Sequence, residues 1–191
     1  MLIARDKFIK TPVMSLQTGG KLAETTRIII NPHNLSVMAF ELRGSLLSDD
    51  KVFLLVQDIR EYSSLGLIVD SNDEFVLLDD IIKLKEVYNL NFHLMGLSAY
   101  DTKKTKLGKV INYSLEPHSF LIKQLNIKRP LLKSFVDTEL IIDRTQVVEV
   151  NRTSIIIESD DRQPSPAKKS TTVYANPFRS TSPQAEVIQP K

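Results

Sequence analysis

The sequence predicts a mainly β protein made of two tandem small antiparallel β-barrels, joined by a short helix and followed by a disordered C-terminal tail. Three observations predict this fold. Residues 21–48 can be overlaid on residues 106–133 without a gap at a shift of 85, short β-branched runs alternate with polar turns, and the last 33 residues are rich in Pro, Ser and Thr. A repeat this long indicates one folding unit used twice. We expect a first copy at 1–79, a linking helix at 80–90, a second copy at 91–158 and a tail at 159–191.

Runs of apolar and β-branched residues predict the strands of the first copy. Polar turns, such as Asn31-Pro32-His33-Asn34, separate these runs. Closely spaced short strands favour an antiparallel barrel or sandwich, and closure into a barrel removes exposed strand edges in so small a unit. The predicted strands are 27–30, 35–42, 51–56, 65–69 and 74–78.

A helix is predicted between the copies, at residues 81–88. Ile81, Leu84 and Tyr88 share one face of this segment, which is the spacing of an amphipathic helix. Asp79 or Asp80 is expected to cap its N-terminus, where a carboxylate also interacts well with the helix dipole.

The second copy repeats the plan with two changes of length. Met14 aligns with Met95 at a shift of 81, which predicts four residues added before Lys106, in the turn at 101–104. After Lys133 the shift becomes 88, so that residues 67–69 align with 155–157. The apolar positions keep their register, which predicts that the copies have the same core.

Composition limits the classes of protein and site. The chain has 191 residues and no cysteine, so a disulfide framework and a thiolate metal site are excluded. The sequence contains no run of about 18 apolar residues, the length that would predict a membrane-spanning helix. We expect a cytoplasmic protein. Net charge is −3 over residues 1–90, +3 over 91–158 and +2 over 159–191. Either the solvated surfaces of the two copies simply differ in charge, or the second copy and the tail face an anionic partner.

Two segments of the second copy resemble motifs of the PRC-barrel family. They are Lys-Leu-Gly-Lys-Val at 106–110 and Ile-Ile-Asp-Arg-Thr-Gln-Val-Val-Glu-Val at 141–150. In that family a turn of lysine, a small apolar residue and glycine precedes a strand, and a later apolar step precedes a final Ile/Val strand. Ala23 replaces the glycine in the first copy. The resemblance covers residues 8–158 as a tandem pair of bacterial type.

The family resemblance implies a binding role and names no reaction. Members include the cytoplasmic domain of a photosynthetic reaction-centre subunit and a domain of a ribosome-maturation factor. What they have in common is a small barrel that docks on a larger assembly. Because one fold serves many functions, this implication is an analogy.

The sequence contains no convincing catalytic, cofactor or metal site. Thr18-Gly19-Gly20-Lys21 is followed by Leu22 and not by the hydroxyl residue of a phosphate loop, so it is interpreted as a hairpin turn. His33 and His118 occupy matching Pro-His turns and are interpreted as turn residues inherited by duplication. A paired metal or proton-relay site is the alternative interpretation. We expect no enzyme and no small-molecule ligand.

Basic residues of the second copy are the candidate contacts for a partner or an anion. The leading hypothesis is a non-enzymatic interaction or scaffold protein with a protein partner. The alternatives are a ribosome-assembly or RNA-associated factor, for which Tyr100, Tyr113 and Phe135 could stack on bases, and peripheral association with an anionic membrane. The candidate residues are Lys103, Lys104, Lys106, Lys109, Lys128, Arg129 and Lys133.

Overall fold

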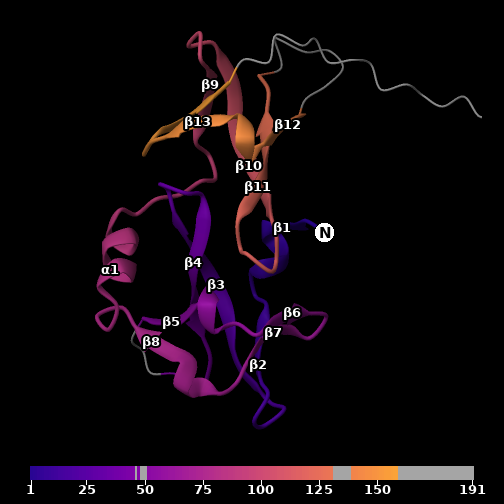
Figure 1. The fold of residues 1–191 in the computed structure, drawn as a ribbon, viewed down its shortest axis with the longest axis vertical. Helices are drawn as coiled ribbons and strands as arrows, with labels where there is room; N and C mark the ends of the chain where they lie inside the picture. The colour runs from indigo at the N-terminus through magenta and orange to yellow at the C-terminus, as the bar shows by residue number, and fades with distance from the viewer. Residues whose placement is uncertain (46, 48–50, 131–138, 159–191) are drawn as a thin grey trace, which may run out of the picture. The chain divides into compact units, whose positions relative to one another are not determined.

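The computed structural model describes residues 1–45, 47, 51–130 and 139–158, and these residues form a mainly β structure (Figure 1). Two sheets and the helix α1 (Ile82–Asn89) make up its regular structure. The prediction of a mainly β chain is therefore confirmed. The predicted tail at 159–191 and the candidate residue Lys133 lie outside the described residues.

The first sheet contains seven described strands in the order β6-β7-β2-β3-β4-β5-β8. The 3-10 turns η2 (Val56–Asp58) and η3 (Asn72–Glu74) connect some of them. The strands are β2 (Pro12–Ser15), β3 (Lys21–Asn31), β4 (Ser36–Arg43), β5 (Val52–Leu55), β6 (Glu61–Ser63), β7 (Gly66–Val69) and β8 (Phe75–Leu77).

The second sheet has the order β12-β11-β10-β9-β14-β13, and β1 pairs with β10 outside this path. The turn η1 (Arg5–Phe8) follows β1, and η5 (Arg144–Gln146) precedes β13. The strands are β1 (Ile3–Ala4), β9 (Ser98–Asp101), β10 (Lys106–Leu115), β11 (Ile122–Lys128), β12 (Glu139–Asp143), β13 (Val147–Val150) and β14 (Ser154–Ile157).

The central hairpins of the two sheets match residue for residue at the predicted shift of 85. Phe40 pairs with Ile28 in the first sheet, and Leu125 pairs with Tyr113 in the second. Both hairpins also have their register shifts at the same two places, between 25 and 27 and between 29 and 30 in the first copy and at the corresponding residues of the second. Bulges are built-in backbone features. Their coincidence therefore supports the predicted overlay over β3–β4 and β10–β11.

The barrel prediction is not confirmed, and the sheets are not purely antiparallel. Among the described residues each path has two ends, β6 and β8 in the first sheet and β12 and β13 in the second, and no pairing joins these ends. Strand β2 pairs with β7 in parallel, as β9 does with β14. Sequence patterns of short strands carry no information on the direction of such a non-local pair, because both directions bury the same apolar residues.

Two details of the predicted alignment are wrong. Met14 pairs with Lys21, and Tyr100 pairs with Lys106, so the residue equivalent to Met14 is Tyr100 and not Met95. The turn at 101–104 is therefore not an insertion. Gly108 lies within β10 at a bulge opposite β9, not in a turn.

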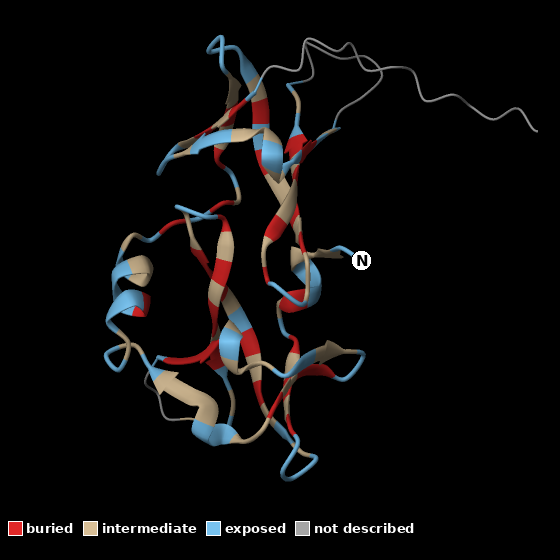
Figure 2. Cartoon of the chain, viewed as in Figure 1, coloured by how far each residue is buried: buried red, intermediate tan, exposed pale blue. Residues whose placement is uncertain are grey.

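Buried residues occur in both copies (Figure 2), and one continuous hydrophobic core includes residues of both. Phe8, Phe40 and Phe120 meet in it, with Phe40 and Phe120 ring centroids 5.8 Å apart. The backbone joins the copies at the same point: the Val37 N–H donates to the Phe120 carbonyl and the Ile122 N–H donates to the Leu35 carbonyl. These two bonds are related by the shift of 85, which gives the contact an internal pseudo-twofold character.

Helix α1 covers one face of the first sheet through a second cluster. Leu84 is fully buried there with Phe53, and the Tyr88 ring lies 5.6 Å from the Phe53 ring. The predicted helix is confirmed, but its predicted cap is wrong. Ile81 is the N-cap, and its hydrocarbon side chain has no atom that can accept a capping hydrogen bond. Asp80 instead accepts from the Leu77 N–H, and Asp79 pairs with Lys85. Within the described residues, helices are too short and too polar to span a membrane.

Lys10 and Gly96 occupy equivalent positions with left-handed backbone, and the structure predicts that Lys10→Gly is stabilising. Lys10 has φ of 59° and Gly96 has φ of 85°, and each N–H donates to the equivalent carbonyl, that of Thr25 or Val110. The left-handed conformation costs a non-glycine residue about 1–2 kcal/mol. Glycine avoids this cost, but it loses more chain entropy on folding, which offsets about 0.5–1 kcal/mol of the gain. We expect Lys10→Gly to raise the free energy of unfolding in urea by about 0.5 kcal/mol. Lys106→Gly in strand β10 should lower it. A loss of stability in Lys10→Gly would contradict the argument.

Candidate functional site

The turn between β9 and β10 presents exposed lysines at one end of the second sheet. Asp101 shapes this turn, because its side chain accepts from the Thr105 N–H at 2.6 Å and its carbonyl accepts from the Lys104 N–H at 2.9 Å. Lys104 takes a left-handed φ of 64° as a result. Lys103 and Lys104 are exposed on the turn, and Lys106 is exposed at the start of β10.

Two further lysines lie directly opposite each other on adjacent strands. Lys109 of β10 pairs in register with Lys128 of β11, and both are exposed. Directly opposite side chains of an antiparallel pair have Cβ atoms about 4.5–5.5 Å apart, and like charges there destabilise the sheet. Glu139 follows in the same row, opposite Lys128 on β12. Within the described part of the chain, Lys106, Lys109 and Lys128 form no ion pair.

The first copy has compensated charges at the same positions. The shift of 85 places Glu24 at the position of Lys109 and Arg43 at that of Lys128, and Glu24 pairs in register with Arg43. Glu24 also forms an ion pair with Lys21, whose hydrogen bond lowers the pKa of the Glu24 carboxyl. The same framework thus carries a balanced charge pair in one copy and two lysines in the other.

The structure brings together most of the basic residues predicted from sequence. We call Lys103, Lys104, Lys106, Lys109, Lys128 and Arg129 the basic surface; all are exposed except Arg129, which is half-buried. The aromatic side chains expected to stack on bases are poorly placed. Tyr113 is 2% exposed and belongs to the core, and burial raises the pKa of its phenol. Tyr100 is half-buried, and Phe135 lies outside the described residues.

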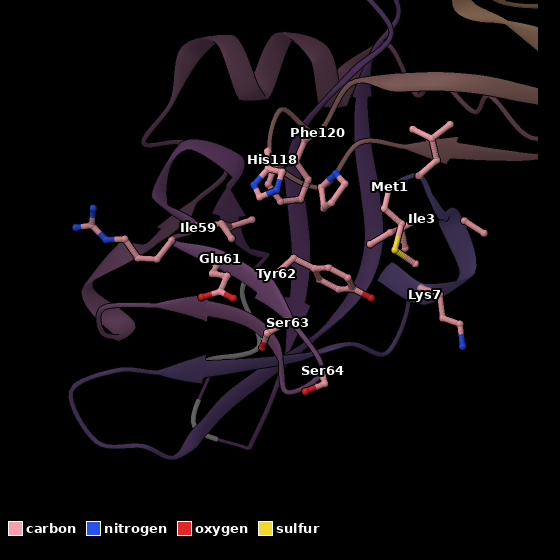
Figure 3. Close-up of a pocket in the computed structure, with 14 residues that line it drawn as sticks. Met1, Ile3, Lys7, Ile59, Glu61, Tyr62, Ser63, Ser64, His118 and Phe120 are labelled. Atoms are coloured by element: carbon pink, nitrogen blue, oxygen red, sulfur yellow. The ribbon is translucent and has the colours of Figure 1, made fainter.

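A groove of about 720 Å³ lies where the Pro117–Phe120 turn of the second copy meets the first copy (Figure 3). The N-terminal residues and the segment 59–64 form its other walls. Tyr62 is half-buried in it, with its ring centroid 4.7 Å from that of Phe8. The floor is therefore the aromatic core that the two copies build together.

A second groove, of about 660 Å³, is the counterpart of the first. The Pro32–Leu35 turn of the first copy meets segment 147–150 of the second there, and these segments correspond to those of the first groove at shifts of 85 and 88. His33 lines the second groove and His118 the first. The two histidines therefore do not share a groove, and the structure does not bring them together in a paired site.

Two polar residues of the first groove, Arg60 and Ser63, are engaged in local hydrogen bonds. Arg60 donates to the Asp70 carboxylate at 3.0 and 3.1 Å from Nε, and Ser63 Oγ accepts from the Leu65 N–H. In the described ranges, no group of three His, Asp or Glu side chains has a metal-binding arrangement. The first groove presents more apolar than polar surface, whereas the second is lined mainly by polar and charged groups, among them His33, Asp143 and Arg144.

Sequence reasoning missed the grooves and the opposed lysine pair. The matching Pro-His turns were a usable signal, but their role needs the contact between copies. The Lys109–Lys128 pair needs the register, including the bulge before Asn112. Comparison with protein-family models and with curated proteins finds no match for this chain.

Proposed function

We propose that this chain is a non-catalytic interaction protein of PRC-barrel type, and that its basic surface binds an acidic face of a protein partner. The opposed pair of Lys109 and Lys128 carries this proposal. In the first copy the equivalent pair is Glu24 and Arg43, so the framework does not require two cations here. An approaching carboxylate relieves the repulsion between the lysines and forms charge-assisted hydrogen bonds.

Two features favour a protein over a nucleic acid or a membrane. Glu139 continues the row of Lys109 and Lys128, and a mixed row suits a protein surface better than a uniform polyanion. Tyr113 is buried, which removes one of the stacking groups that single-stranded RNA would use. RNA and anionic membrane remain the alternatives that the experiment separates.

The proposal is tested by affinity purification with the full chain and by the binding constant of each recovered protein. We expect Lys109→Glu to weaken binding at least tenfold, about 1.4 kcal/mol, and Lys83→Glu on α1 to leave it unchanged. Lys83 is exposed, so the control makes the same change of charge on the helix that covers the first sheet. Equal effects of both variants, loss of recovery after nuclease treatment, or binding to phosphatidylserine vesicles in place of protein would overturn the proposal.

Lys109→Glu is also expected to stabilise the fold. It replaces a repulsive cross-strand pair by the acid–base pair that the first copy has at Glu24 and Arg43. Cross-strand pairs contribute about 0.2–1 kcal/mol, so we expect the free energy of unfolding in urea to rise by about 0.5 kcal/mol. The gain should shrink in high salt. A variant that binds less and is also less stable would indicate misfolding and would contradict this prediction.

A further inference from the structure

Strand β12 is an edge strand at a position where the first copy has a further neighbour. The shift of 88 places Val52–Leu55 of β5 on residues 140–143 of β12. In the first sheet β5 is flanked on its other side by β8, with Val52 opposite Leu77, Phe53 opposite Val76 and Leu54 opposite Phe75 (Figure 1). Within the described residues β12 pairs with β11 alone. An edge strand of this kind is a template for an added strand.

Strand β12 carries an apolar side chain on its exposed face. Ile141 is 60% exposed, whereas its equivalent Phe53 is fully buried beneath Tyr88 of α1. Its row neighbours on β11 and β10 are Asn126 and Asn112. A helix with an apolar face like that of α1 would therefore find little to pack on here, but an apolar side chain opposite Ile141 on a strand beside β12 would pack against it.

The chain does not repeat the sequence of β8 after the second copy. At the shift of 88, Phe75, Val76 and Leu77 correspond to Gln163, Pro164 and Ser165. None of the three is a large apolar residue, and proline has no N–H to donate to a neighbouring strand. The apolar strand that completes the first sheet is therefore not encoded at the corresponding place for the second.

Charge argues against a second copy of β12 as the neighbour. In an antiparallel pair of β12 strands centred on Ile141, Glu139 of each strand would lie opposite Asp143 of the other, and like charges in that arrangement are unfavourable. The same two carboxylates favour a strand with basic residues at its ends. Asp143 stays ionised readily, since hydrogen bonds from Thr145 lower the pKa of its carboxyl.

We propose that β12 binds an extended segment of a partner protein as an added antiparallel strand. Three apolar residues of that segment lie opposite Leu140, Ile141 and Ile142, and basic residues on either side lie opposite Glu139 and Asp143. The template is the pairing of β8 with β5. Backbone hydrogen bonds supply affinity in such strand addition, and the alternating side chains supply specificity. This site goes beyond the basic surface and uses different residues.

The test uses the full chain and a synthetic peptide, Thr-Lys-Phe-Val-Leu-Lys-Thr, with a fluorescent label. We expect the peptide to bind saturably with a Kd below about 1 mM. Binding should also slow hydrogen exchange at the amides of residues 139–143. Ile141→Lys should weaken binding at least tenfold. The matched control is Val148→Lys on β13, which is 62% exposed and should bind as the unchanged chain does.

Other results would overturn the proposal. They are no binding at that concentration, unchanged exchange at residues 139–143, equal loss in both variants, or equal binding of a peptide with Glu in place of both Lys residues. A dimer that Ile141→Lys dissociates would instead assign the edge to a second copy. Circular dichroism checks that the variant is folded. Because Lys109 is untouched in every arm, failure here leaves the proposed function standing.

Discussion

Gly108→Ala is expected to lower the free energy of unfolding by about 3 kcal/mol. A Cβ added at Gly108 would lie 2.1 Å from the carbonyl oxygen of Lys128 and 2.8 Å from Cγ2 of Ile127. The first of these atoms belongs to the backbone of β11 and cannot move without breaking the central hairpin. The φ of Gly108 is also +156°, a conformation that side chains rarely adopt.

The equivalent position in the first copy provides the control for Gly108→Ala. The shift of 85 places Ala23 there, in the same register opposite β2 as Gly108 has opposite β9. Ala23 is buried, and Ala23→Gly should cost about 1 kcal/mol through chain entropy and lost packing. Urea unfolding of both variants gives the comparison. A cost of Gly108→Ala no larger than that of Ala23→Gly would contradict the predicted clash at Gly108.

The sequence predicts the duplication well because the apolar register survives in both copies. Phe40 and Leu125 are both large apolar residues that must face the core, and a slip of one residue would turn either to solvent. The overlay of β3–β4 on β10–β11 rests on such positions and is confirmed. The failure at Met14 has the opposite cause, since a short strand offers too few apolar positions to fix its register.

Features set by backbone geometry or distant pairing could not be predicted. The resemblance to the family motif predicts a turn at the glycine of Lys-Leu-Gly, but glycine in a sequence signals turns and strand bulges alike. Strand β1, at Ile3–Ala4, pairs with β10 more than 100 residues away, and no periodicity records that pairing. Whether the strands of the described residues close into a barrel likewise depends on which of them pair.

The sequence predicts which residues form the candidate site, but it does not predict which of them lie opposite one another. The clustering of Lys103, Lys104, Lys106 and Lys109 is visible in sequence, because they lie close along the chain. The meaning of Lys128 depends on its position opposite Lys109, and thus on the hairpin register. The edge of β12 has no sequence signal of its own. It becomes visible only by comparison with β5, which has a neighbour in β8.

Phe40→Ala is expected to lower the free energy of unfolding by about 3–5 kcal/mol and to destabilise both sheets together. Phe40 is fully buried, stacks on Phe8 at 6.0 Å and meets the edge of Phe120 at 5.8 Å. Truncating a buried phenylalanine removes its transfer free energy and leaves a cavity. Since Phe120 belongs to the second copy, the cavity opens at the contact between copies.

Hydrogen exchange measured strand by strand in Phe40→Ala shows whether the two copies unfold together or separately. If the core is continuous, amides of β4 and of β11 lose the same free energy of protection, because the most protected amides exchange through global opening. The control Leu65→Ala truncates a side chain that is 65% exposed and should cost less than about 0.5 kcal/mol. Unchanged protection of β11 beside weakened β4 would mean that the copies unfold independently. In that case the phenylalanine cluster would join two separately stable units.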